Sequence, residues 1–167
     1  MTPDVADLAA RLAALDARFQ ALEDELAITR TVVEYGFAVD AGNAEATGAL
    51  YTEDTVFDVD GGFVMRGRDQ VERMVNGRGH QSLLPNCAHT IGPVVVRPDG
   101  DTAVAVGYSR IYHRQGDDFV LFRIGCNRWE LERSPTGWII ATRTTRVLGS
   151  DESQAILASG LREPPVD

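Results

Sequence analysis

"NCAHTIGPVVVRPDGDTAVAVGY" (86–108) is the stretch that decides the fold. Apolar residues alternate on both sides of "PDGD" (98–101), a pattern typical of two strands joined by a tight turn. The turn sequences "QGDD" (115–118) and "SPTG" (134–137) repeat the pattern farther along the chain. The sequence therefore predicts four long consecutive strands, at about 87–97, 102–114, 118–133 and 137–148.

Helices are predicted before this sheet. Ile28, Val32, Tyr35 and Val39 recur at spacings of three and four, which indicates a helix from 27 to about 41. Asn43 is expected to cap a short helix that runs through residue 50. Residues 69–76 are predicted to form another helix. Between them, two short alternating runs flank "DGG" (60–62) and predict a hairpin. Helices followed by a long antiparallel sheet define an α+β fold.

A stripe of apolar residues precedes the core. Its members alternate at spacings of four and three, as in a coiled coil, and they are Leu8, Leu12, Leu15, Phe19, Leu22 and Leu26. Two interpretations remain open: the stripe packs on its own domain, or it mediates self-association. We therefore expect an N-terminal helix at 1–26, one core domain at 27–149 and a C-terminal tail at 150–167.

Length and charge restrict the class of protein. The 167 residues suffice for one domain with a single pocket. The net charge of −9 argues against nucleic acid as a partner. No stretch approaches the roughly 18 apolar residues of a membrane span, and we expect no signal peptide because the N-terminal residues lack a basic flank and a continuous apolar run. The two cysteines, Cys87 and Cys126, are expected to be buried free thiols, so we expect a cytoplasmic protein.

His89 is the candidate for chemistry among three histidines. His80 lies in a glycine-rich loop and His113 adjoins a turn, so we expect both to be exposed. Their spacing matches no metal motif, and no metal is expected. Cys87 would point to the same face as His89, but nothing supplies the other groups that a thiol nucleophile needs. For His89 a core role and a role as a base remain open.

Two charged residues stand at unusual positions. Arg143 shares a strand face with Ile139 and Ala141, so it needs a carboxylate, a carbonyl or a ligand. A salt bridge at the rim of the sheet is the simplest interpretation. Asp40 ends the core helix, where the helix dipole disfavours a carboxylate. Another group is therefore expected to hold Asp40.

Five segments carry a family resemblance that covers about three quarters of the chain, from about residue 27 to 149. They are "YGFAVDAGN", "LYTEDTVFDVDGG", "MRGRDQV", "CAHTIGPVVVRPDGDTAVAVGY" and "NRWELERSPTGWIIATRTTR". In this order they resemble the SnoaL-like branch of the nuclear transport factor 2-like (NTF2-like) superfamily, and most of all its set of dehydratases and hexachlorocyclohexane dehydrochlorinases. The resemblance implies a cone-shaped α+β barrel, with N-terminal helices packed on a strongly curved antiparallel sheet.

The resemblance also implies a site. His89 matches a base that abstracts a proton from the substrate, and Asp40 matches the aspartate that orients and charges it. Tyr35 matches a pocket tyrosine, and Arg143 matches an arginine that holds a leaving group or an acidic substituent. The expected substrate contacts are Tyr51, Phe57, Tyr108, Tyr112 and Asn127.

These expectations point to a cofactor-independent lyase, a dehydratase or related enzyme, that acts on a small apolar cyclic substrate. An imidazole with a carboxylate on its other nitrogen is a suitable base for such an elimination. An isomerase or cyclase with the same dyad is the alternative within enzymes. A non-catalytic small-molecule-binding or assembly module is the alternative outside them, because this scaffold hosts several functions. A homo-oligomer, either dimer or trimer, is expected.

Overall fold

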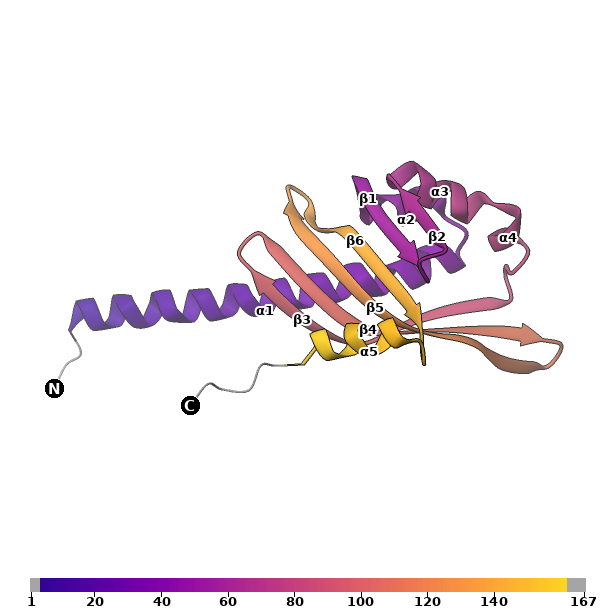
Figure 1. The fold of residues 1–167 in the computed structure, drawn as a ribbon. Helices are drawn as coiled ribbons and strands as arrows, with labels where there is room; N and C mark the ends of the chain where they lie inside the picture. The colour runs from indigo at the N-terminus through magenta and orange to yellow at the C-terminus, as the bar shows by residue number, and fades with distance from the viewer. Residues whose placement is uncertain (1–3, 162–167) are drawn as a thin grey trace.

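Six strands form one open sheet in the computed structural model, which describes residues 4–161 (Figure 1). The strands are β1 (Tyr51–Val59), β2 (Phe63–Arg66), β3 (Cys87–Asp99), β4 (Thr102–Gln115), β5 (Asp118–Ser134) and β6 (Gly137–Val147). Their order across the sheet is β2-β1-β6-β5-β4-β3, so β2 and β3 are the edges. The predicted hairpin and the four predicted long strands are confirmed, and so is the α+β class.

One strand departs from the expected antiparallel sheet. β1 pairs with β6 in parallel, whereas every other neighbouring pair is antiparallel. No tight turn joins β1 to β6, because two helices and the strands β2 to β5 lie between them in the chain. Tight turns impose an antiparallel direction only on the strands that they connect directly. The sheet is therefore mixed.

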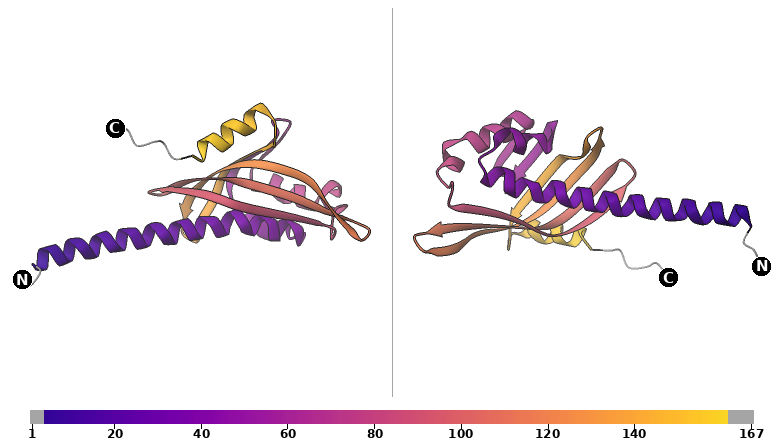
Figure 2. Two further views of the ribbon diagram at one scale, coloured as in Figure 1. Left: turned by 90° about the horizontal axis from the view of Figure 1, so that it is seen from below. Right: turned by 180° about the vertical axis from the view of Figure 1, so that it is seen from behind.

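Helices cover both faces of the sheet (Figure 2). One face packs on α1 (Val5–Asp40), near which lie α2 (Ala44–Ala49), α3 (Arg68–Asn76) and α4 (Arg78–Gln81). The other face packs on α5 (Asp151–Ser159), which occupies part of the predicted tail. The Asn43 side chain accepts a hydrogen bond from the backbone N–H of Ala46 at 2.9 Å, which confirms the predicted cap. Residues 1–3 and 162–167, the ends of the predicted flanking segments, lie outside the described residues.

The predicted N-terminal helix and the first core helix are one continuous helix. α1 has 36 residues and crosses the expected boundary at 26 and 27 without a break. Its N-terminal half extends past the sheet (Figure 1), and its first buried residue is Asp24. The apolar stripe from Leu8 to Leu26 is exposed. The interpretation that this stripe packs on its own domain is therefore wrong.

Asp24 fixes α1 to the sheet where the helix leaves the domain. Its carboxylate accepts hydrogen bonds from both Nη atoms of Arg133, at 3.0 and 2.9 Å, and from the indole N–H of Trp138 at 3.1 Å. The hydrogen bonds from Arg133 hold the pKa of Asp24 below its usual value. The direction in which α1 leaves the domain is thus set by specific contacts.

No helix within residues 4–161 is both long and apolar enough to cross a membrane.

Candidate active site

His89 and Asp40 form a close hydrogen-bonded pair. Asp40 is the last residue of α1, and His89 is the third residue of the edge strand β3. The imidazole Nδ1 lies 2.6 Å from Asp40 Oδ1, and the backbone N–H of His89 donates to Asp40 Oδ2, also at 2.6 Å. An ionised carboxylate only accepts hydrogen bonds, so Nδ1 carries the proton and Nε2 keeps a free lone pair. Within residues 4–161, Nε2 has no hydrogen-bond partner.

A glycine in α1 permits this approach. Gly36 lies one helical turn before Asp40, and a Cβ added to Gly36 would overlap the carbonyl oxygen of His89. Asp40 stands at the disfavoured end of the helix dipole, and it accepts from the His89 backbone, from the His89 ring and, at 3.6 Å, from the Cys87 thiol. These donors offset the unfavourable interaction of the carboxylate with the helix dipole, and they hold the carboxylate next to Nδ1 of the imidazole.

Asp40, Cys87 and His89 also have the composition of a metal site. Their ligand atoms lie within 4.8 Å of one another. However, Nδ1 of His89 is already paired with Asp40, and burial together with the Asp40 charge raises the pKa of Cys87 to about 11. A metal ligand must be the thiolate, which that pKa disfavours near neutral pH. The three residues therefore suit a hydrogen-bonded cluster better than a metal centre.

The raised pKa of Cys87 leads to a testable expectation. The thiol should react with iodoacetamide at pH 7 about 100-fold more slowly than an unperturbed cysteine, because a pKa of about 11 leaves about 100-fold less thiolate than the usual 9.0. Peptide mass spectrometry can follow Cys87 separately from Cys126, with glutathione as the reference thiol. Asp40→Asn should accelerate the reaction. Alkylation of Cys87 as fast as that of glutathione would contradict the expectation.

His80 is not exposed, and the prediction that it is was wrong. α4 folds back onto the end of α1, so that the side chain is buried. Its Nε2 lies 2.8 Å from the carbonyl oxygen of Val39, and its ring centre lies 6.0 Å from that of His89. His80 thus helps to fix the helix end that carries Asp40.

Tyr35 joins the dyad to a buried cluster around Arg143. The ring of Tyr35 meets that of His89 edge to face, with centres 6.3 Å apart. On its other side, the guanidinium carbon of Arg143 lies 4.1 Å from the Tyr35 ring centre. The same guanidinium lies 4.4 Å from the ring centre of Phe57 and 5.5 Å from that of Trp129. Asp40, His89, Tyr35 and Arg143 therefore form a row from the helix end into the core.

Arg143 is a buried cation without a carboxylate partner among the described residues. Its side chain donates twice to Asn127 Oδ1, at 3.2 and 3.0 Å, and once to the Tyr51 hydroxyl at 3.3 Å. Only 3% of Arg143 is exposed, and no carboxylate oxygen within residues 4–161 lies within 4.0 Å of it. The interpretation as a salt bridge at the sheet rim is therefore wrong. Burial raises the pKa of Tyr51 and of Tyr35, so both phenols stay protonated.

The structure brings some of the expected substrate contacts to this row and not others. Tyr51, Phe57 and Asn127 lie in the Arg143 cluster. Tyr108 packs with the residues that face α5, on the other side of the sheet. Tyr112 pairs with Ala88 on the neighbouring strand β3. Neither Tyr108 nor Tyr112 is among the residues that line the groove beside the dyad.

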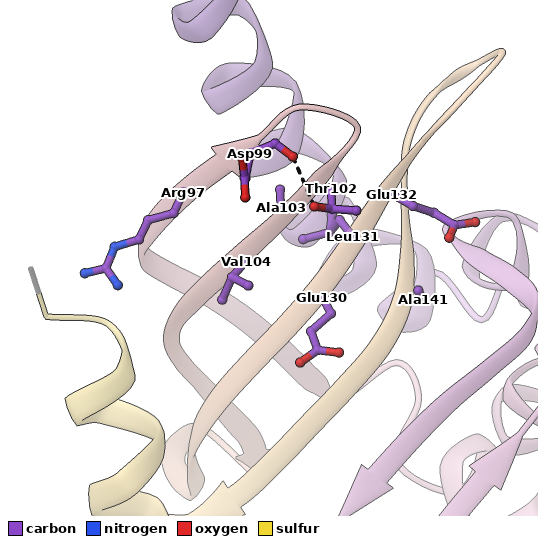
Figure 3. A pocket seen from close by; sticks show the side chains of 9 residues that line it. All are labelled: Arg97, Asp99, Thr102, Ala103, Val104, Glu130, Leu131, Glu132 and Ala141. Atoms are coloured by element: carbon purple, nitrogen blue, oxygen red, sulfur yellow. Dashed lines mark hydrogen bonds between the residues drawn. The ribbon is translucent and has the colours of Figure 1, made fainter.

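A groove gives access to the dyad along the seam between α1 and β3. It has a volume of about 210 Å³ and is lined by Val33, Phe37, Asp40, Ala88, His89, Thr90 and Ile91. A larger hollow of about 360 Å³ lies at the far end of the strands (Figure 3), and it shares no lining residue with the groove. Its charged side chains, such as Arg97 and Glu132, are remote from the histidine. We therefore take the smaller groove as the candidate active site.

A long helix packed on an open, mixed six-stranded sheet is the fold of the NTF2-like class with a cystatin-like fold, to which a solved relative of this chain belongs. Within that class the chain belongs to the SnoaL-like domain family, whose family model matches residues 20–144. This confirms the resemblance to the SnoaL-like branch. The family includes enzymes that act on small molecules.

Solved structures agree with this assignment. An NTF2-like protein with a cystatin-like fold from Novosphingobium aromaticivorans is 34% identical, covers 94% of this chain and 99% of its own, and superposes with a TM-score of 0.80. A protein from the same organism that is provisionally named an aromatic ring hydroxylase is 26% identical over 77% of this chain and 92% of its own, with a TM-score of 0.63. A provisionally named scytalone dehydratase, again from that organism, is 19% identical over 75% and 85%, with a TM-score of 0.66, and shows the fold alone. Among curated proteins, none matches the sequence.

Proposed function

We propose that the protein is a cofactor-independent lyase that removes water or a similar leaving group from a small cyclic substrate. The observation that carries this proposal is the 2.6 Å contact between His89 Nδ1 and Asp40 Oδ1, because it leaves Nε2 of the imidazole as a free base. The expectation that no cofactor or metal takes part remains a prediction.

The proposed reaction needs only groups of this chain. Nε2 of His89 takes a proton from a carbon next to an electron-withdrawing group, and the electron pair of that C–H bond forms the new double bond. The leaving group departs with its own bonding pair. The imidazolium formed is stabilised by Asp40 and can return its proton to a departing hydroxide, which gives water.

The Arg143 cluster contributes to the proposed reaction indirectly, without contact with the substrate. Tyr35 separates Arg143 from His89, and Arg143 itself is almost fully buried. We therefore assign Arg143 as a positioning residue, whose charge orients Tyr35 and Tyr51 and favours negative charge that develops near the Tyr35 hydroxyl. This differs from direct contact with a leaving group, which the resemblance implies.

The groove supports the choice of substrate. Its walls beside the dyad are largely apolar, with Val33, Phe37 and Ile91 among them. Its volume of about 210 Å³ is smaller than the roughly 300 to 1,000 Å³ of common drug-sized sites. A single small ring with one or two polar substituents fits such a site.

The test is incubation of the full chain with a panel of small cyclic β-hydroxy ketones and cyclic halides, followed by mass spectrometry in H₂O and in D₂O. A lyase releases a product that has lost water or acid, and Asp40→Asn should slow this release. Tyr108→Phe is the matched control, because Tyr108 lies on the other face of the sheet.

Each other outcome identifies an alternative. A product of unchanged mass with deuterium at the activated carbon indicates an isomerase or cyclase that uses the same base. Binding of panel members without deuterium exchange or product contradicts catalysis and leaves the non-catalytic binding module.

A further inference from the structure

The first half of α1 carries an apolar stripe that no described part of the chain covers. We call the segment Val5–Leu26 the arm. Its stripe residues are each at least half exposed, and they are Val5, Leu8, Leu12, Leu15, Phe19, Leu22 and Leu26. The arm leaves the domain at Asp24 and projects beyond the sheet (Figure 2). A continuous row of this length on an exposed helix is typical of a protein interface.

The stripe points away from the domain. The residues by which α1 packs on the sheet include Ile28, Thr31 and Tyr35. At about 100° per residue, the mean direction of the stripe lies about 180° around the helix axis from these residues. A second helix can therefore lie along the stripe without competing with the sheet.

The spacing of the stripe fits a coiled coil. Val5, Leu12, Phe19 and Leu26 are seven residues apart and occupy the a positions of a heptad, while Leu8, Leu15 and Leu22 occupy the d positions. After Leu26, the heptad continues with Thr29 at a d position and Val33 at an a position. The following d position is Gly36, against which the His89 carbonyl packs. The available seam thus ends before β3 crosses the helix.

The charges beside the stripe select the partner and its direction. In a parallel, in-register pair, each g residue faces the e residue five positions later on the other chain. These pairs are Arg11 with the partner's Asp16, Arg18 with the partner's Glu23, and Glu25 with the partner's Arg30. All three pairs have opposite charges. Antiparallel registers instead bring like charges together, such as Arg11 beside the partner's Arg18, or Asp16 beside the partner's Asp16.

We propose that the arm binds the arm of a second copy of this chain as a parallel, in-register coiled coil. The two domains then lie at the same end of the pair. The apolar seam stabilises the dimer, and the flanking charges favour the parallel direction of the two arms.

Charge reversal tests the pairing. The triple variant Arg11→Glu, Arg18→Glu, Glu25→Arg places like charges at all three contacts, and so does the triple variant Asp16→Arg, Glu23→Arg, Arg30→Glu. By light scattering after gel filtration, each full-length variant should have half the mass of the wild type, and an equimolar mixture should regain it. Circular dichroism checks that each variant is folded. Equal masses for the wild type and both separate variants would overturn the proposal.

A disulfide tests the direction. Leu15→Cys places identical d residues opposite each other only in a parallel pair, so oxidation should give a covalent dimer of twice 18.2 kDa. Ala17→Cys is the control, because residue 17 lies on the opposite side of the arm and should not cross-link. An unlinked Leu15→Cys protein of dimer mass would be antiparallel and would overturn the proposed direction. A monomeric wild-type chain would overturn the proposal as a whole.

Discussion

His89→Gln is expected to lower kcat by about 10²- to 10⁴-fold, the usual contribution of a general base, while the fold is retained. The glutamine preserves most of the side-chain volume and can still donate to Asp40, but it offers no nitrogen lone pair at the position of Nε2. Steady-state kinetics on the substrate found in the panel would show the loss of kcat, and circular dichroism would show that the fold is retained.

A matched control separates chemistry from packing. His113→Gln changes a partly buried histidine on the neighbouring strand β4 that contacts neither Asp40 nor the groove. It should retain nearly full activity. If His89→Gln keeps activity within tenfold of the wild type, His89 is not the base.

Gly36→Ala is expected to lower the free energy of unfolding by about 2 to 3 kcal/mol, as overpacking of a dense core does. Helix propensity alone predicts that the substitution raises the free energy of unfolding, because alanine is more favourable than glycine in a helix interior by about 1 kcal/mol. The contact decides the sign: the new Cβ would overlap the backbone carbonyl of His89, and neither α1 nor β3 can move without disturbing the dyad. For a domain of this size the melting temperature should fall by about 4 to 12 °C.

Gly62→Ala is the control for this experiment. Gly62 lies in the turn between β1 and β2, where a Cβ meets no atom within 4 Å. Its effect should stay within about 0.5 kcal/mol. Thermal denaturation and activity should be measured on the same samples. Gly36→Ala should lose both stability and activity, whereas Gly62→Ala should lose neither. A Gly36→Ala protein as stable as the wild type would mean that the helix and the strand are not in close contact.

The sheet could be predicted because its signals are local. Alternation and the three turns place the four long strands within a few residues of their observed ends. The parallel pairing of β1 with β6 has no such signal, since it depends on how distant segments meet. His80 was misplaced for the same reason, because only the tertiary contact between α4 and α1 buries it.

The site was predicted only in part. The family resemblance implied Tyr35, Asp40 and His89 as site residues, and the structure places His89 next to the other two. The surroundings of Arg143 could not be predicted from the turn at 134–137. Counting residues outward from that turn gives Arg128 as the partner of Arg143 on the neighbouring strand. A bulge between Glu130 and Leu131 shifts the partner to Trp129, so the guanidinium enters an aromatic cluster.

The continuity of α1 constrains the length of the chain as well as its shape. Because one unbroken helix carries both the stripe and the side that packs on the sheet, the two directions are locked about half a turn apart. An insertion of one residue after Leu26 would turn the stripe by about 100° and aim it elsewhere, whereas an insertion of seven residues would restore its direction to within about 20°. The segment that joins the arm to the domain can therefore change in whole heptads but not one residue at a time.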